Sequence, residues 1–306
     1  MLNQTFSDKT LSLALAFSAG VWGLYWYPLR AIEATGMSGG WSVVFFNACP
    51  LVLLIPLLLW QFGRFVSMIW PTLLAALMIG LAFTFYANGL VETTIIRATL
   101  LYYLTPVWST LLGVIWLSEP LTRARVVAIV VAFGGLLLLL SVGGESASHP
   151  LNIGDLYSLL SGIFWAFGVA TLNRWSRIPL IPLTAFIFLF TTLVSAFFAG
   201  LLNAQVLPEL VMVERAFATA AFWSIVIFLP CFVVIFRVSQ VLFPGRVGIL
   251  CMSEVVVAIA SAAWLVPEEN MRLLQWVGAA AIIAAGLIEV LLGYQNSTPD
   301  TEVKQV

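Results

Sequence analysis

The chain is a succession of long apolar stretches separated by short polar breaks. Charged residues, prolines and glycine clusters divide it into ten segments of about 20 mostly apolar residues, the length that an α-helix needs to cross a bilayer. The segments are residues 11–30, 41–61, 69–90, 94–117, 123–142, 154–173, 180–202, 217–237, 245–266 and 271–292. The pattern predicts an all-α integral membrane protein with ten transmembrane helices and no soluble domain.

The two halves of the chain align with each other. A shift of 149 positions superimposes three pairs of like charges: Arg97 on Arg246, Glu119 on Glu268 and Arg123 on Arg272. A shift of 143 positions superimposes Trp22 on Trp165. We interpret these matches as an internal duplication, although chance matches in such an apolar chain are the alternative. Repeats in membrane proteins are typical of transporters, whose site lies between the two halves.

Five spans per half are an odd number, so a duplicated second half has the opposite orientation in the membrane. We therefore predict two inverted five-helix repeats, at residues 1–145 and 146–295, followed by a cytoplasmic tail at 296–306. Alternating access by rocking of the two repeats follows from this arrangement.

The composition is that of a polytopic membrane protein. Apolar residues make up 62% and charged residues only 9% of the chain, whereas about a quarter of the residues of soluble domains are charged. The 13 basic and 14 acidic residues nearly balance, which excludes a basic surface for nucleic acid. The three cysteines lie in apolar segments without metal-ligand spacing, and the single histidine, His149, lies in a loop. We expect no metal, no cofactor and no enzymatic activity.

The distribution of Lys and Arg predicts that both termini are cytoplasmic. With ten spans and the N-terminus inside, most basic residues fall on the cytoplasmic side: Lys9, Arg64, Arg123, Arg125, Arg174, Arg177, Arg237, Arg246 and Lys304. The outer side then holds Arg30, Arg97, Arg215 and Arg272. The expected location is a bacterial-type inner membrane.

Glu254 is an acidic residue deep within the ninth span. It lies about 13 Å into the span, close to the middle of a ~30 Å hydrocarbon core. An ionised side chain costs about 2.5–3.5 kcal/mol there. Under the 149-residue shift its counterpart is Thr105, next to Pro106, so both helices carry an irregularity at the same depth. We interpret Glu254 as a substrate or proton site; a protonated or Arg-paired structural glutamate is the alternative.

Three further charges are candidates for gating or charge pairing. Arg97 and Arg246 lie near the ends of their spans and are expected to neutralise Glu92 and Glu254 or to contact a substrate carboxylate. The alternative is that the arginines extend to the membrane interface.

Aromatic residues gather at similar depths in several spans. Spacings of three and four place Trp22, Tyr25 and Trp26 on one helical face, and the further candidates are Tyr86, Tyr102, Tyr103, Trp108 and Trp165. Belts of Trp and Tyr at the interface are the ordinary alternative. Trp22, Trp108 and Trp165 lie deeper, and their indole N–H groups need partners. A partly hydrated cavity that offers stacking or cation–π contacts provides such partners.

Small residues mark the fifth and tenth spans. Gly134 and Gly135 in the fifth and the alanines at 279–281 and 284–285 in the tenth permit close approach of two backbones. We expect these helices to pack together or to support a homodimer; ordinary enrichment of small residues is the alternative.

Several motifs give the chain a family resemblance. It has Pro106-Val107-Trp108 in the fourth span, Leu-Ser-Glu-Pro-Leu-Thr at residues 117–122 and glycines in the fifth span. With two halves of five spans, the chain resembles the drug/metabolite transporter superfamily, in particular its EamA family. It departs from that pattern at Glu254-Val255, where the family often has Glu-Pro, and at the turn 266–270, which lacks the Leu-x-Glu-x-Leu-Thr sequence.

The resemblance implies a central cavity between the halves and transport of small metabolites, and many bacterial members are similar to amino-acid exporters. The aromatic candidates fit export of apolar or aromatic amino acids. A carrier of quaternary ammonium or other organic cations is the main alternative, because an acid among aromatic rings serves either. A membrane-embedded enzyme or scaffold is a remote alternative.

Overall fold

The structure, a computed structural model, describes residues 8–61, 63, 66–116, 123–141, 151–175, 177–239, 250–266 and 272–288. Within these ranges the regular elements are all helices, so the all-α prediction is confirmed. Five helical segments are long and apolar enough to cross a membrane: Gly39–Trp60, Val66–Glu92, Ile153–Leu172, Leu180–Leu202 and Leu210–Val238. The other predicted spans contain shorter helices.

The elements of the first half follow the predicted spans. They are α1 (Asp8–Trp22), α2 (Trp26–Glu33), α3 (Gly39–Ala48), α4 (Leu51–Trp60), η1 (Val66–Met68), α6 (Ile69–Glu92), α7 (Ile95–Tyr102), α8 (Thr105–Trp116) and α9 (Arg123–Ser141). The first, second and fourth predicted spans are thus each divided into two helices.

The elements of the second half are α10 (Ile153–Arg174), α11 (Leu180–Phe197), η2 (Phe198–Leu202), α12 (Leu210–Ala221), η3 (Phe222–Phe228), α13 (Leu229–Ser239), α15 (Ser253–Leu265) and α16 (Leu273–Ile288). The predicted start of the eighth span at residue 217 is wrong, because the helix begins at Leu210. The first residues of this helix include Glu214 and Arg215, two charged residues that favoured the interpretation of this stretch as a loop. η2 and η3 are π-helical turns, which often mark functional sites.

Each interruption has a local cause. Pro106 lacks the N–H that would bond to the Tyr102 carbonyl, so α7 ends at Tyr102 and the Thr105 hydroxyl donates to that carbonyl instead. The first span is broken by tight turns at residues 23–25, where the N–H of Leu24 bonds to Val21 O at 3.0 Å. A side chain at Gly23 would collide with the Glu254 carbonyl of α15. Close backbone crossing of α1 and α15 therefore requires glycine at this position.

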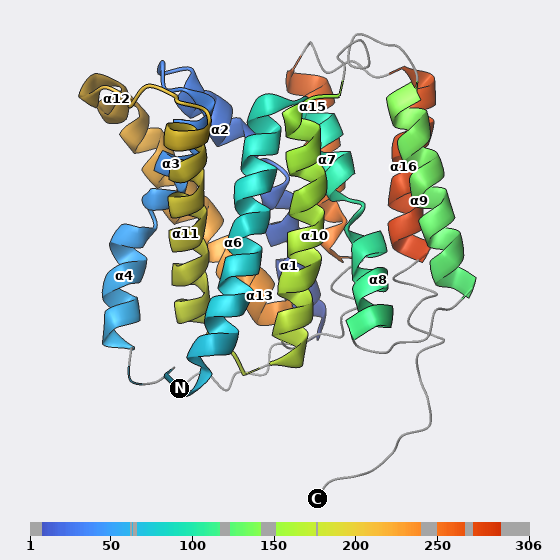
Figure 1. Ribbon diagram of the computed structural model, residues 1–306, viewed down its shortest axis with the longest axis horizontal. Coiled ribbons are helices and arrows are strands. Elements are labelled where there is room, and N and C mark those ends of the chain that lie inside the picture. The colour runs from blue at the N-terminus through green and yellow to red at the C-terminus, as the bar shows by residue number, and fades with distance from the viewer. Residues whose placement is uncertain are drawn as a thin grey trace, which may run out of the picture.

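α9 and α16 lie side by side at one end of the molecule (Figure 1). A Cβ at Gly135 would lie 2.7 Å from the carbonyl oxygen of Gly278 and 3.0 Å from the Ala281 Cβ, whereas a Cβ at Gly134 would meet no atom of the described part of the chain within 4 Å. The prediction that these two helices pack together through small residues is confirmed, and Gly135 makes the contact.

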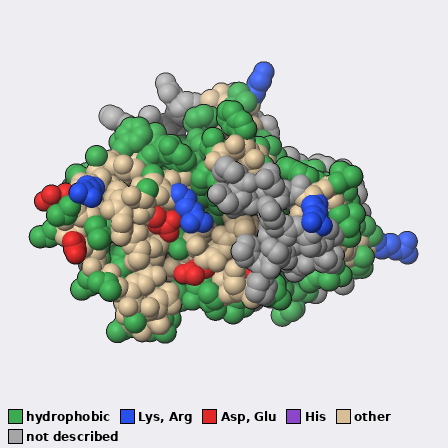
Figure 2. Space-filling view, turned by 90° about the horizontal axis from the view of Figure 1, so that it is seen from above, with side chains coloured by type: hydrophobic (Ala, Val, Ile, Leu, Met, Phe, Trp, Pro, Cys, Tyr) green, Lys and Arg blue, Asp and Glu red, His purple; other side chains and the backbone are tan. Residues whose placement is uncertain are grey.

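The upper face of the molecule carries acidic and basic side chains among apolar ones (Figure 2). On α2, Arg30 donates to the carboxylate of Glu33 and to the backbone carbonyl of Leu90, both at 3.2 Å. Leu90 belongs to the last turn of α6, whose carbonyls lack helical donors. Arg30 therefore caps α6 and joins α2 to it.

Candidate functional site

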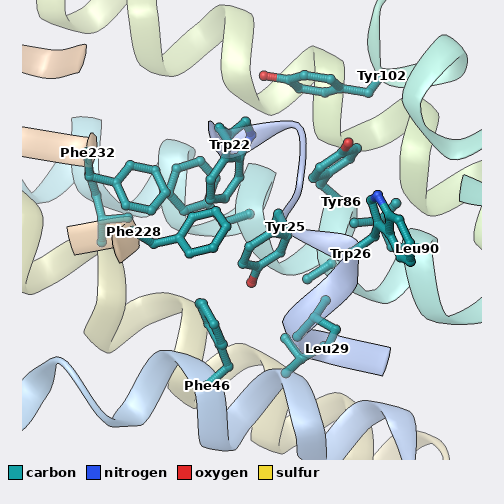
Figure 3. Packing of buried hydrophobic residues seen from close by; sticks show 14 of the residues in the cluster. Trp22, Tyr25, Trp26, Leu29, Phe46, Tyr86, Leu90, Tyr102, Phe228 and Phe232 are labelled. Carbon is teal, nitrogen blue, oxygen red and sulfur yellow. The ribbon is translucent and has the colours of Figure 1, made fainter. Parts of the chain in front are cut away.

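Aromatic rings fill the centre of the main core, around Trp22 at the end of α1 (Figure 3). The Trp22 ring lies 4.4 Å from Tyr25, 4.6 Å from Phe232 and 5.0 Å from Phe83, measured between centroids. The Tyr25 hydroxyl accepts a hydrogen bond of 3.1 Å from the amide of Asn47 on α3. The interrupted first span is thus held on several sides by aromatic packing.

Phenylalanines missed in the sequence complete this cluster. Phe228, Phe232 and Phe236 recur every four residues and therefore lie on one face of η3 and α13. This spacing is visible in the sequence, but phenylalanine is ordinary in a membrane helix whether it faces lipid or the core. Phe83 is the most informative omission, because it contacts both Trp22 and Trp165, the latter stacked at 5.9 Å. The two tryptophans related by the 143-residue shift therefore meet at one ring.

A group of tyrosines adjoins the cluster. The rings of Tyr86 on α6 and Tyr102 on α7 lie 4.8 Å apart, and the Tyr86 hydroxyl bonds to Thr99 at 3.2 Å. Tyr102 also lies 5.3 Å from Tyr103 and 6.5 Å from Trp165. Trp26, on α2, donates from its indole nitrogen to Ser261 of α15 at 3.1 Å. The structure therefore brings together most of the predicted aromatic residues.

Trp108 is the exception. It packs beside a different cluster, formed by Leu104, Val107, Ala132 and Ala285 toward α9 and α16. Its indole N–H is buried and donates to no acceptor within the described residues. Its depth in the fourth predicted span grouped it with the other aromatic residues, but the structure packs it against this second cluster instead.

Glu254 lies in the first turn of α15 and is only 5% exposed. Its carboxyl oxygen Oε2 accepts from the Tyr103 hydroxyl at 3.0 Å, and Tyr86 and Tyr102 lie within electrostatic range. Within the described residues, the second oxygen, Oε1, is buried and has no hydrogen-bond partner. The N-terminal end of a helix favours a negative charge. Glu254 is thus a buried acid with one unused acceptor.

α1 fixes the position of this carboxyl group through contacts with α15. The Ser253 hydroxyl donates to the Ala16 carbonyl at 2.8 Å, and Gly23 packs on the Glu254 backbone. The Trp22 indole is a further neighbour of the carboxyl group. The acid and the aromatic cluster therefore form one site, at the breaks in the first, fourth and ninth predicted spans.

The expected pairing of Arg97 is corrected by the structure. Its guanidinium forms a buried ion pair with Asp155 of α10, with Nη2 and Oδ2 2.8 Å apart. Asp155 also accepts from the hydroxyl of Thr93 at 3.0 Å and caps α10 together with Asn152. Glu92, the expected partner, is exposed at the end of α6. The sequence gives no sign of this pairing, because a capping acid close to a loop does not reveal a distant arginine.

Arg246, the remaining candidate for charge pairing, lies outside the described residues. The buried ion pair joins α7 to α10, whereas Glu254 accepts a hydrogen bond from Tyr103 and is in no ion pair within the described residues. Breaking such a pair on one side leaves an uncompensated buried charge. Arg97 and Asp155 are therefore placed to hold helices of the two halves together.

Comparison with known proteins indicates the class of membrane protein that the chain resembles. The chain shares its fold with a solved structure described as a crystal structure of a protein, with a TM-score of 0.62 and 16% identity over 95% of this chain and 100% of that one. None of the curated proteins compared matches the chain. Residues 10–141 match a family within the drug/metabolite transporter superfamily, a class of membrane proteins that carry small metabolites.

That family is the EamA-like transporter family, whose model matches residues 10–141 of this chain. The resemblance based on the Pro-Val-Trp and Leu-Ser-Glu-Pro-Leu-Thr motifs is therefore confirmed. Members of the family are transporters of small metabolites and not enzymes.

Proposed function

We propose that the chain exports apolar or aromatic amino acids by alternating access, with Glu254 and the aromatic cluster as its binding site. The observation that carries the proposal is the buried Oε1 atom of Glu254, which has no hydrogen-bond partner among the described residues. A carboxylate at membrane depth is costly and usually functional. An ammonium group donates to such an oxygen, and the neighbouring rings stack on an apolar side chain.

The geometry of the helices supports a site between two moving halves. α7 gives way to a turn at Tyr103–Leu104, and the 149-residue shift takes these positions to 252–253, where Met252 forms the turn before α15. Interrupted helices that face each other at mid-depth are typical of secondary transporters. This correspondence favours the inverted repeats at 1–145 and 146–295.

The Oε1 atom of Glu254 also favours amino acids over quaternary ammonium cations as substrates. A primary ammonium carries three hydrogens, so it satisfies this buried acceptor as a lysine ammonium does. A quaternary ammonium has no N–H and interacts with the rings alone. Amino acids therefore fit better than quaternary cations, which remain the alternative substrates.

Transport in reconstituted vesicles tests the proposal. Vesicles loaded with unlabelled L-phenylalanine should accumulate labelled L-phenylalanine by counterflow, and L-leucine should compete with it. Phenylpropionate, which lacks the ammonium group, should compete poorly. Competition by tetramethylammonium instead of amino acids would establish the alternative, and counterflow of either compound excludes a scaffold or enzyme.

Glu254→Gln is the informative variant, because glutamine keeps the shape but removes the charge. Glu254→Gln should lose most phenylalanine binding, whereas Glu214→Gln, at an exposed position on α12, should bind like the unmodified protein. Equal binding by both variants would show that Glu254 is structural.

The orientation completes the proposal. We infer from the distribution of Lys and Arg that both termini face the cytoplasm of a bacterial-type inner membrane. A Cβ at Gly134 would meet no atom of the described residues within 4 Å, so the α9 surface that carries Gly134 is where a homodimer contact would form. Crosslinking through a cysteine introduced at position 134 tests whether this homodimer contact forms.

A further inference from the structure

A second group of aromatic rings lies outside the central cluster, where α10 and η2 meet over α6. The Phe85 ring of α6 lies 5.4 Å from Phe164 and 5.6 Å from Tyr157, both on α10, measured between centroids. Phe198, the first residue of the π-helical turn η2, lies 5.5 Å from Phe85 and 5.7 Å from Tyr157. Because α6 lies between α10 and α11 (Figure 1), these four rings join three neighbouring helical segments.

The four rings are partly exposed and extend along the helices from one end of α6. Gly154 marks this end, since a Cβ there would lie 2.8 Å from the backbone of Glu92, the last residue of α6. Phe85 lies about 10 Å along α6 from Glu92. Tyr157 and Phe164 lie about 5 Å and 15 Å along α10 from Gly154. The rings therefore cover about 15 Å, half of a ~30 Å hydrocarbon core and thus the depth of one leaflet.

Glu92 adds an exposed carboxylate at the same end of α6. The other charges nearby are paired: Arg30 lies 3.2 Å from Glu33, and Arg97 lies 2.8 Å from Asp155. Within the described residues, Glu92 takes part in no ion pair. The carboxylate of Glu92 therefore leaves this end of the face with a net negative charge.

The charge and the rings together define the ligand that fits this face. Belts of Trp and Tyr at the interface need no ligand, but they stay at headgroup depth, whereas these rings continue through a leaflet. An acyl chain is long enough to cover them, and its headgroup then lies beside Glu92. A primary ammonium donates hydrogen bonds to a carboxylate, whereas a trimethylammonium has no N–H and an anionic headgroup is repelled. The Tyr157 hydroxyl, within electrostatic range of Glu92, is a donor for a phosphate oxygen.

We propose that this face binds one phospholipid with a primary ammonium headgroup. The ammonium group pairs with Glu92, and a phosphate oxygen accepts from the Tyr157 hydroxyl. One acyl chain packs along the rings of Phe85, Phe164 and Phe198. The bound lipid joins α6 to α10 and η2, which belong to different predicted halves, and so stabilises their contact. The site is separate from the aromatic cluster around Glu254 and does not depend on which substrate that cluster binds.

Thermal unfolding of the delipidated protein in detergent tests the headgroup preference. The lipids added are phosphatidylethanolamine, phosphatidylcholine and phosphatidylglycerol with identical acyl chains. Phosphatidylethanolamine should raise the melting temperature by several degrees, because a ligand that binds only the folded state stabilises it. The other two lipids should raise it less, and free ethanolamine, which has no acyl chain, should leave it unchanged. Mass spectrometry of the intact protein should detect one retained phosphatidylethanolamine.

Variants at each end of the face separate the headgroup contact from the chain contact. Glu92→Gln should abolish the preference for phosphatidylethanolamine over phosphatidylglycerol, and Glu92→Lys should reverse it. Glu214→Gln, at an exposed acid on α12, is the matched control and should keep the preference. Phe164→Ala should reduce the stabilisation by all three lipids, whereas Phe217→Ala, at a 59% exposed ring on α12, should not. Each variant is compared with its own lipid-free melting temperature, so a loss of intrinsic stability does not enter the result.

Three results would overturn the proposal. Equal stabilisation of the unmodified protein by all three lipids would show that the face has no headgroup preference. A preference for phosphatidylethanolamine that persists in Glu92→Gln would place the headgroup elsewhere. Stabilisation by free ethanolamine equal to that by phosphatidylethanolamine would show that Glu92 binds a soluble amine and that the rings hold no acyl chain.

Discussion

Replacing Trp22 by alanine removes the ring at the centre of the aromatic cluster. Trp22 is 6% exposed, and its ring lies between 4.4 and 6.4 Å from those of Tyr25, Phe83, Tyr86, Phe228 and Phe232. Truncation of a buried Trp costs about 3–5 kcal/mol. The upper end of that range is expected, because contacts with several rings are lost together.

This expectation revises the view of Trp22 as the wall of a cavity. A cavity wall has few packing partners, and its removal weakens binding more than folding. Trp22 packs on all sides in the structure, whereas Trp165 is only partly buried. Trp165→Ala should therefore cost less stability, below about 3 kcal/mol, and reveal its effect in substrate binding.

Thermal unfolding in detergent measures the loss of stability, and a phenylalanine-binding assay measures the loss of substrate binding. Trp264 is 85% exposed on α15, so Trp264→Ala is the matched control and should change stability by about 0.5 kcal/mol or less. Trp22→Phe should restore part of the stability. A melting curve of Trp22→Ala that coincides with that of Trp264→Ala would refute the central packing role.

Three further predictions concern other parts of the fold. Asp155→Asn should destabilise the protein by about 3–5 kcal/mol because Arg97 keeps a buried charge, and Asp155→Leu with Arg97→Leu should recover part of the loss in the same melting assay. Gly135→Leu should force α9 from α16 and cost about 1–3 kcal/mol, while Gly134→Leu is tolerated; equal melting temperatures would contradict the packing. A cysteine introduced at residue 149 should react with an impermeant maleimide in intact cells, and reaction only after permeabilisation would reverse the proposed orientation.

The positions of the helices were predictable because apolarity is a property of each residue and sums along the chain. The break beside Pro106 was predictable too, because a missing N–H is a local defect. The break at Gly23 was not, since membrane helices tolerate glycine and the cause is the backbone of α15, more than two hundred residues away. Sequence patterns report local chemistry and leave such crossings hidden.

The site was predicted in part for the same reason. Glu254 and most of the aromatic residues stood out as polar or amphipathic groups in apolar segments. Phe83 and Phe232 did not, because phenylalanine is ordinary in a membrane helix whether it faces lipid or the core. The pairing of Asp155 with Arg97 did not stand out either, because the two residues are distant in sequence. Contacts between segments, and not composition, decided each of these cases.

Gly23 leaves α1 and α15 in contact through their backbones at Glu254. The position of the acid is therefore set by main-chain atoms, which every substitution at neighbouring positions retains. The rings around it belong to other helices and can be exchanged one at a time. On the proposed function, such a chain can diverge in the side chains that it accepts during evolution while its anchor for the amino group stays in place.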